Sequence, residues 1–233
     1  MPFKGLLIQV AIAFFASAIL VSVAYFFVDR PVAYFVHDQG LRECSFLKWL
    51  TYLPEALIFI APLVLVLSLA RFWFKPLTRH ERVFLASSIG ILFMLVLVRV
   101  LKIVFGRYWP ETWTNGNPSL IQTGEYGFHP FHYGIAYAAF PSGHTAQTVA
   151  VISVLWHAYP RYRLIWVAVS LVVVVGLVGV NYHFVGDTIG GAFLGGLIGT
   201  LVSQWFRLRP NSAVLPTDAS PTPSADPVLQ GLE

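Results

Sequence analysis

The sequence predicts an all-α protein: a bundle of six transmembrane helices with an extracytoplasmic cap between the third and the fourth. Three observations lead to this class. Of the 233 residues, 57% are hydrophobic and only 11% are charged, which is unlike an ordinary soluble domain. Six apolar stretches approach the ~20 residues that a helix needs to cross a ~30 Å hydrocarbon core. A long aromatic segment rich in Gly, Pro and Asn separates the third stretch from the fourth.

The expected spans each combine an apolar run with breakers at both ends. In order, they cover residues 5–27, 53–73, 84–105, 143–159, 163–181 and 187–205. The first has no small-residue cleavage site, so we expect a retained anchor with no processing. The fourth is short but clearly bounded. Five glycines give the sixth a small-residue face suited to close helix packing: Gly190, Gly191, Gly195, Gly196 and Gly199.

Basic residues predict which side of the membrane each connection occupies. They crowd the second and fourth connections and the end of the last span: Arg71, Lys75, Arg79, Arg82, Arg161, Arg163, Arg207 and Arg209. Cytoplasmic loops carry an excess of such residues. Both termini are therefore expected in the cytoplasm, with residues 28–50, 106–142 and 182–186 on the opposite face. The expected location is the bacterial inner membrane, as a multi-pass protein whose site faces the periplasm or the exterior.

Two segments outside the spans have a distinct composition. Residues 106–140 are dense in aromatic side chains and are expected to fold as a cap, either as an interfacial aromatic belt or as a lid for a lipid headgroup. From residue 210 onward Pro, Ser, Thr and Asp dominate, which predicts a disordered cytoplasmic tail. The expected organisation is a membrane domain over residues 1–209 and a tail over 210–233. Glu111 in the cap is expected to face solvent.

A Pro-Ser-Gly-His run opens the fourth expected span, from Pro141 to His144. The first N–H groups of a helix have no partner within the helix and can hold an anion. Gly143 lets a phosphoryl group come close to the backbone. His183 and Asp187 follow about forty residues later, where the sixth span begins. Together the two segments predict a site for phosphate chemistry at one end of the membrane helices.

The two histidines and the aspartate fit an in-line displacement at phosphorus. We expect His183 to attack phosphorus, with Asp187 four residues later holding its other ring nitrogen. His144 is expected to protonate the leaving group. A merely structural role for the histidines is disfavoured, because ionisable groups inside a membrane are costly and usually functional.

Displacement at phosphorus also requires positive charge around the phosphoryl oxygens. Lys102 and Arg107, at the end of the third span, are expected to bind these oxygens together with the backbone N–H groups near Ser142 and Gly143. The scheme requires no metal ion and no other cofactor.

These residues resemble the motifs of the type 2 phosphatidic acid phosphatase superfamily, whose members share a helical core with vanadium-dependent haloperoxidases. The resemblance covers about residues 84–205. Pro-Ser-Gly-His is matched in full from Pro141 to His144, and the family's His-x3-Asp is matched by His183 and Asp187. The resemblance implies lipid-linked phosphate substrates, a phosphohistidine formed on His183, and His144 as the acid that protonates the leaving group.

Two motifs depart from the family pattern. The family's first motif, Lys-x6-Arg-Pro, places an arginine where this chain has Trp109, seven residues after Lys102. The third motif begins with Ser-Arg, where this chain has Gly176 and Leu177. Each lost guanidinium removes charge-assisted hydrogen bonds worth roughly 1.5–3 kcal/mol. Arg107, two residues before Trp109, and Arg99, one turn before Lys102, are candidate replacements.

The sequence therefore predicts an integral membrane lipid phosphatase that hydrolyses a phosphomonoester or diphosphate of a lipid on the non-cytoplasmic face. The alternative is a lipid phosphotransferase, because the departures resemble those of sphingomyelin-synthase-like enzymes. A non-enzymatic transporter fits less well, since the centres of the first, second and fifth spans are almost wholly apolar. The expected partners are the bilayer and a lipid phosphate. The net charge of +4 is accounted for by the membrane anchors, so no nucleic acid is expected.

Overall fold

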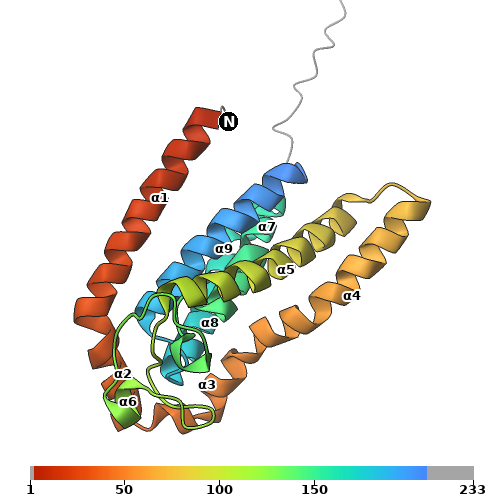
Figure 1. Ribbon diagram of the computed structural model, residues 1–233. Helices are drawn as coiled ribbons and strands as arrows, with labels where there is room; N and C mark the ends of the chain where they lie inside the picture. Colours follow the sequence, from red (N-terminus) through yellow and green to blue (C-terminus); the bar gives the residue numbers. More distant parts are fainter. Residues whose placement is uncertain (1–2, 209–233) are drawn as a thin grey trace, which may run out of the picture.

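The computed structural model describes residues 3–208, and every regular element in that range is helical (Figure 1). The all-α prediction is confirmed for this part of the chain. In order, the elements are α1 (Phe3–Val23), the π-helical turn η1 (Ala24–Val28), α2 (Asp29–Asp38), η2 (Leu41–Glu43), α3 (Ser45–Leu50), α4 (Tyr52–Phe74), α5 (Arg79–Phe105), α6 (Leu120–Thr123), η3 (Ile135–Tyr137), α7 (Gly143–Ala158), η4 (Pro160–Tyr162), α8 (Arg163–Gly179) and α9 (Val185–Trp205).

Five helical segments within residues 3–208 are long and apolar enough to cross a membrane, judged by length and composition. They are Gly5–Asp38, Ser45–Phe74, Arg79–Phe105, Pro160–Gly179 and Val185–Trp205. The remaining expected span, 143–159, is the helix α7 of 16 residues, which is shorter than the ~20 residues of a typical span. The count of six spans therefore stays a prediction.

Helix α7 lies at the centre of the bundle, where it packs against α9 and α5. Glycines of α9 bring α7 and α9 into backbone contact. A Cβ atom at Gly195 or Gly199 would meet a main-chain oxygen of α7, and one at Gly191 would meet the main-chain oxygen of the N-cap residue Ser142. The packing role predicted for these three positions is confirmed. Gly196 faces open space instead.

Helix α5 has a clear signal at each end. At its start, Thr78 and Glu81 form a reciprocal capping box, in which each side chain binds the other residue's backbone N–H, and such a pair satisfies two N–H groups that the helix leaves without partners. At its end, Gly106 has φ 55°, and its position is crowded by the His129 carbonyl. Glycine is the residue that tolerates both conditions, so the chain turns sharply here into the 106–142 segment.

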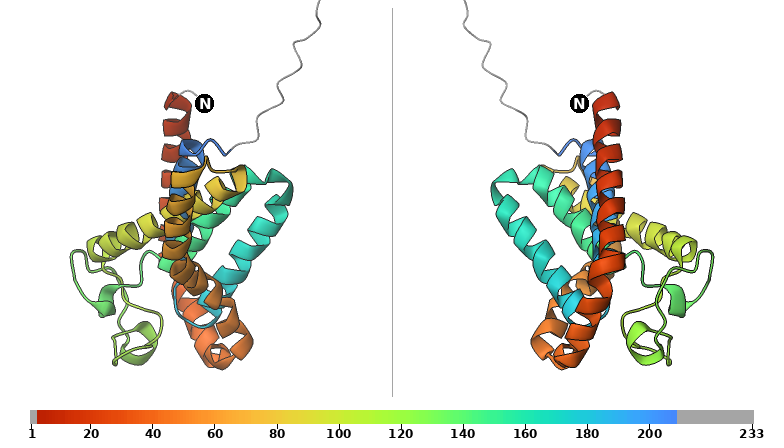
Figure 2. Two further views of the ribbon diagram at one scale, coloured as in Figure 1. Left: turned by 90° about the vertical axis from the view of Figure 1, so that its right-hand side faces the viewer. Right: turned by 90° about the vertical axis from the view of Figure 1, so that its left-hand side faces the viewer.

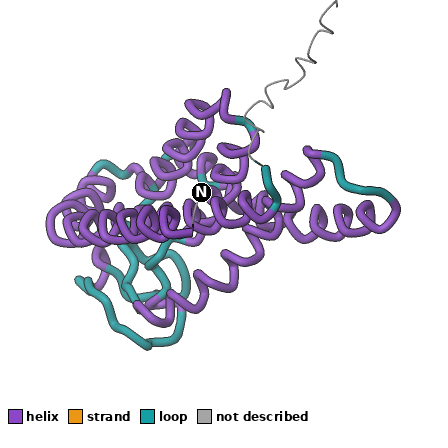
Figure 3. Tube along the Cα trace, turned by 90° about the horizontal axis from the view of Figure 1, so that it is seen from above, coloured by secondary structure: helices purple, strands orange, loops and turns teal. Residues whose placement is uncertain are grey.

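The two ends of the bundle differ in structure. Figures 1 and 2 show the first residues of α1, the last residues of α9 and the α4–α5 connection at one end, and α2, α3 and α6 at the other. Seen from above, the long loop of the 106–142 segment gathers on one side of the bundle (Figure 3). The predicted tail, 210–233, lies outside the described residues.

The 106–142 segment is folded, as predicted, although it contains only short helices. Its backbone is held by hydrogen bonds that join distant parts of the segment, such as Arg107 N–H to Tyr137 O at 2.8 Å and Leu120 N–H to Trp109 O at 3.0 Å. Aromatic rings of the segment also pack against one another, as Phe128 does against Phe140. The side of the membrane on which this segment lies remains the sequence prediction.

Candidate active site

A cavity of about 570 Å³ lies where α5, α7 and the turn before α9 meet the 106–142 segment. Lys102 of α5, Trp109 of the 106–142 segment, Gly143 and His144 of α7, and His183 before α9 all line it. Four of these residues are among those predicted from the sequence. The fold thus brings together side chains that lie up to about eighty residues apart.

Part of the cavity wall between α4 and α5 is apolar, beside the charged residues Glu55 of α4 and Arg99 and Lys102 of α5. Ile58 of α4 and Leu95, Val98 and Ile103 of α5 line this part. A polar end and an apolar side are the features expected of a site that binds an amphiphilic molecule.

His183 lies in the turn between α8 and α9, with 3% of its surface exposed. Its Nδ1 is 3.4 Å from Oδ2 of Asp187, although the alignment does not meet the geometry of a hydrogen bond. Burial is the main cause that lowers the pKa of His183; Lys102 adds to the effect, and Asp187 opposes it. A lowered pKa favours the neutral imidazole, and a neutral ring carries the lone pair that a nucleophile needs.

Asp187 occupies the first turn of α9, one helical turn after His183. Its Oδ2 accepts the backbone N–H of Phe184 at 2.9 Å, and its Oδ1 accepts Nη1 of Arg107 at 2.5 Å. Its main-chain oxygen accepts the N–H of Ser142 at 3.0 Å. The carboxylate is fully buried, so its contact with His183 is fixed from several directions.

Arg107 does not take the position that the sequence suggested. Its guanidinium is fully buried behind the cavity and donates from Nη1 to Asp187 and from Nη2 to Oδ2 of Asp29, at 2.5 and 2.6 Å. Burial opposes its charge, but Asp187 and Asp29 outweigh burial and raise the pKa of Arg107. The expectation that Arg107 binds phosphoryl oxygens needs correction, because two carboxylates already occupy its guanidinium.

The start of α7 supplies the predicted helix N-terminus. Ser142 is the N-cap, and its Oγ accepts the N–H of Thr145 at 3.3 Å. The N–H of Ser142 itself is engaged by Asp187, so this donor is directed away from a ligand, contrary to expectation. Gly143 and His144 follow at the first two helical positions, where backbone N–H groups have no partner within the helix. The ring centroids of His144 and His183 are 6.3 Å apart.

Trp109 fills the place where the family pattern has an arginine. The indole is 5% exposed and its Nε1 donates to the carbonyl of Ile135 at 2.6 Å. Nζ of Lys102 lies 5.3 Å from its ring centroid, within the range of a cation–π contact. The ring of His183 lies 5.3 Å away on centroids. An aromatic surface thus joins the lysine to the histidine.

Further polar residues line the cavity, among them Arg99 and Gln147 as well as Glu55, His132 and Tyr182. Arg99, which the sequence offered as a replacement for a missing arginine, is part of the wall beside Lys102. Gln147, one turn after His144 in α7, was not predicted. Its Oε1 is buried and has no hydrogen-bond partner among residues 3–208. The i, i+3 spacing from His144 was the sequence signal that could have identified it.

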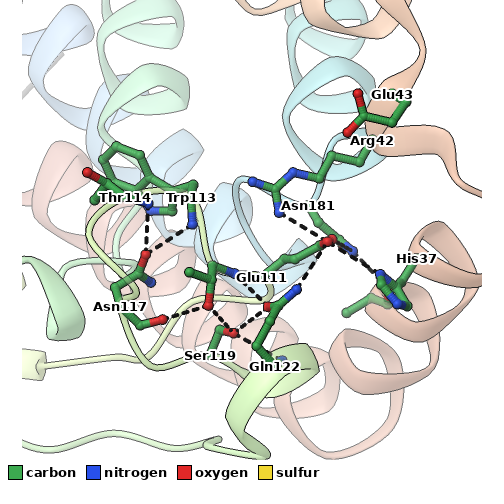
Figure 4. Close-up of polar contacts among 12 residues, drawn as sticks. His37, Arg42, Glu43, Glu111, Trp113, Thr114, Asn117, Ser119, Gln122 and Asn181 are labelled. Carbon is green, nitrogen blue, oxygen red and sulfur yellow. Dashed lines mark hydrogen bonds and ion pairs between the residues drawn. The ribbon is translucent and has the colours of Figure 1, made fainter.

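Glu111 is the centre of a buried polar network that ties the 106–142 segment to the rest of the bundle (Figure 4). Only 6% of it is exposed, so the expectation that it faces solvent was wrong. Its Oε1 pairs with Arg42 at 3.1 Å and with His37 at 3.3 Å, and its Oε2 accepts Nδ2 of Asn181 at 3.0 Å. Asn181 stands two residues before His183, so the network also supports the turn that carries the histidine.

Comparisons with known proteins agree with these observations. Residues 83–211 match the family model of the PAP2 superfamily. Two curated relatives are lipid A 1-phosphatases, from Rhizobium etli with 29% identity and from Rhizobium johnstonii with 28% identity, each over 118 residues. Each match covers 51% of this chain but 44% and 42% of the relatives, so the chain spans less than half the length of the curated relatives it matches.

A solved structure is also similar: the crystal structure of a transmembrane PAP2-type phosphatidylglycerolphosphate phosphatase from Bacillus subtilis. The TM-score is 0.43 and the sequence identity is 17%, and the match covers 88% of this chain and 98% of that one.

Proposed function

This chain belongs to the PAP2 superfamily, and from that membership we propose that it is an integral membrane lipid phosphatase acting through a phosphohistidine intermediate. The observation that carries the proposal is the meeting of Lys102, His144 and His183 in one cavity, with Asp187 fixed behind His183. A nucleophile, an acid and a cation within one cavity are the parts that phosphoryl transfer needs.

The first step forms a bond between His183 and phosphorus. Because Nδ1 of His183 faces Asp187, Nε2 is the atom that attacks. The bond between phosphorus and the leaving oxygen breaks in line, and His144 donates a proton to that oxygen, so a lipid alcohol leaves from a phosphomonoester and a lipid monophosphate leaves from a diphosphate. Asp187 stabilises the positive charge that develops on the His183 ring.

The second step returns the enzyme to its starting state. A water molecule gives a proton to His144 and attacks phosphorus, the bond from His183 to phosphorus breaks, and inorganic phosphate leaves. Throughout both steps, Lys102 and the N–H groups at the start of α7 hold the equatorial oxygens. The scheme uses no metal ion.

The cavity supports an amphiphilic substrate. Its apolar wall between α4 and α5 suits a hydrocarbon chain next to the phosphate. The substrate classes are phosphatidic acid, phosphatidylglycerophosphate, a polyprenyl diphosphate and a phosphorylated glycolipid. The two relatives are lipid A 1-phosphatases, and this likeness supports the phosphorylated glycolipid as the first substrate to test.

The site is proposed to face away from the cytoplasm, on the periplasmic side of a bacterial inner membrane. The basic residues of the α4–α5 connection and of the α7–α8 connection support this orientation. Residues 1–209 are proposed to form the membrane domain, crossing six times with α7 as the short span.

The test is release of inorganic phosphate by detergent-purified protein from a panel of the four lipid classes, with EDTA present. His183→Ala is the key variant. His80→Ala is its matched control, since His80 lies at the start of α5, at the opposite end from the cavity. The expected result is phosphate release that survives EDTA and His80→Ala and disappears in His183→Ala.

Two outcomes contradict parts of this proposal. Phosphate release that His183→Ala retains removes His183 as the nucleophile. When a second lipid alcohol is supplied, a new phosphorus-containing lipid, detected by mass spectrometry without phosphate release, identifies a phosphotransferase instead.

A further inference from the structure

A buried chain of charged groups extends behind His183 to the N-terminal helix, the segment Gly5–Asp38 that α1, η1 and α2 form. Asp187 binds Arg107, and Arg107 binds Asp29 at the start of α2. Exposure is 1% for Asp29 and 0% for both Arg107 and Asp187. An ion pair held in such a place is costly unless each charge is fully partnered, so Asp29 is a required partner of Arg107 rather than a surface group.

Asp29 also binds the helix that carries Asp187. Its Oδ1 accepts the backbone N–H of Gly186 at 2.9 Å, in the first turn of α9. One carboxylate therefore fixes two things that determine where Asp187 lies: the guanidinium that binds its Oδ1, and the backbone one residue before it.

The local structure around Asp29 is built for this contact. The π-helical turn η1 ends at Val28, directly before Asp29, and such turns inside helices occur often at functional sites. A Cβ atom at Gly186 would lie 3.0 Å from Oδ2 of Asp29 and 3.3 Å from Nη1 of Arg107. Glycine at 186 is therefore what allows α9 to approach the two charges. Asp29 lies outside the family match, which begins at residue 83.

We propose that Asp29 is a positioning residue of the active site: through Arg107 and the Gly186 N–H it holds Asp187 in the place from which Asp187 orients His183. The N-terminal helix is then part of the catalytic apparatus. The proposal rests on the proposed function, because it assigns Asp29 a role in the reaction of His183. Without the charge of Asp29, Arg107 has a single carboxylate to bind and draws Asp187 away from the imidazole.

The first experiment compares Asp29→Asn with Asp38→Asn. Asparagine keeps the shape and an oxygen for the Gly186 N–H but removes the charge. Asp38 ends the same helix and is exposed, so it is a matched control. We expect Asp29→Asn to lower kcat by tenfold to hundredfold, roughly the loss seen when an outer partner of a site ligand is removed, with KM within about twofold. Asp38→Asn should have the kcat and KM of the wild type.

A double-mutant cycle separates positioning from general damage. If Asp29 acts through Asp187, adding Asp29→Asn to Asp187→Asn should lower kcat by less than about threefold further. Losses that multiply in full would overturn the proposal. So would an unchanged kcat in Asp29→Asn.

An NMR titration of His183 does not depend on catalysis, so it tests the role of Asp29 separately from the proposed function. The charged or titratable groups nearest His183 are Asp187, Lys102 and His144; Arg107 binds Asp187 from behind, and Glu55, Arg99 and His132 line the same cavity. The His183 ring signal, assigned by its loss in His183→Ala, can be titrated by NMR in detergent. Removing the negative charge of Asp29 disfavours the imidazolium form, so the midpoint should move to lower pH in Asp29→Asn and stay in place in Asp38→Asn. An unmoved midpoint contradicts the proposal even if the wild type hydrolyses no lipid.

Gly186→Ala is the second variant, for the case in which Asp29→Asn does not fold. It alters no charge but places a methyl group against both Asp29 and Arg107. We expect the same loss in kcat and a shift of the His183 titration midpoint in the same direction, to lower pH. Activity and midpoint both equal to the wild type would overturn the assignment.

Discussion

The indole of Trp109 lies against the imidazole of His183, with ring centroids 5.3 Å apart. The contact places a tryptophan beside the proposed nucleophile, where the family pattern has a phosphate-binding arginine. Because Nζ of Lys102 faces the same indole, the ring orients both the cation and the histidine. From these contacts we predict that Trp109 acts by positioning its two neighbours rather than by binding phosphate.

Replacing Trp109 with Arg is expected to lower kcat/KM by more than tenfold. The new guanidinium would be buried next to Lys102, and neither the ring contact with His183 nor the hydrogen bond to Ile135 would remain. Trp109→Phe, which keeps an aromatic ring, should lose less than tenfold. Steady-state kinetics on the best substrate of the panel provides the comparison. Tighter phosphate binding or faster hydrolysis in Trp109→Arg would mean instead that the missing arginine limits the site.

His144 can be tested through the leaving group. With a lipid phosphate, whose alkoxide needs a proton, His144→Ala should lose about 10²–10⁴-fold in kcat. With p-nitrophenyl phosphate, whose phenolate leaves without a proton, the loss should be much smaller. His183→Ala should abolish turnover of both. Equal losses on the two substrates in His144→Ala would argue against its role as the acid.

Short motifs in the sequence were enough to place several residues of the candidate site. Pro141 and Ser142 lead into α7, Gly143 and His144 begin it, and His183 and Asp187 lie on either side of the start of α9, so their closeness to helix ends could be inferred from local structure alone. The spans α4, α5, α8 and α9 followed from apolar length. The packing of Gly195 followed from a repeated small residue.

Long-range pairing was beyond the same reasoning. Arg107 binds Asp29 across 78 positions and Asp187 across 80, and no pattern within either segment identifies the partner. A charge at the end of an apolar span looks the same whether it meets a phosphate or a buried carboxylate. Glu111 was misjudged for the same reason, since its partners Arg42 and Asn181 come from distant segments.

The packing of α9 on α7 predicts opposite effects for neighbouring glycines. A Cβ atom at Gly195 would lie 2.9 Å from the backbone nitrogen of Ala150 and would also meet the Ala146 carbonyl. Gly195→Ala must separate the helices, at a cost of about 1–3 kcal/mol, and should lower Tm by several degrees. Gly196→Ala meets nothing within 4 Å and gains helix propensity worth up to about 1 kcal/mol. Thermal unfolding of the two variants in detergent checks this prediction. Equal changes in Tm for Gly195→Ala and Gly196→Ala would contradict the packing described here.

The Glu111 network predicts a loss of stability in acid. Burial opposes the charge of Glu111, but the hydrogen bond from Asn181 and the charges of Arg42 and His37 outweigh it and lower the pKa of the carboxyl below its usual 4.5. A group whose pKa is lower in the folded state stabilises above its unfolded pKa and loses this contribution as the pH falls through the folded value.

Glu111→Gln should therefore lower Tm at pH 7, by the equivalent of about 1–3 kcal/mol, and should reduce the further loss below pH 4.5. Glu125, in the same segment, is exposed, and Glu125→Gln is the matched control. Melting curves between pH 7 and pH 3 supply the measurement. A Tm of Glu111→Gln that follows the wild type at every pH would remove the network as a source of stability.

The single cysteine offers a direct test of the orientation of the active site. Cys44 is exposed and lies between η2 and α3, at the end of the bundle that carries α6 and the 106–142 segment (Figure 1). If this end faces the periplasm, a membrane-impermeant maleimide should label Cys44 in intact cells as fully as in lysed cells. Lys75, exposed in the α4–α5 connection, lies at the opposite end. In a Cys44→Ser background, Lys75→Cys should be labelled only after lysis. The reverse pattern would place the cavity on the cytoplasmic side, and the lipid phosphate would then have to be presented from the inner leaflet.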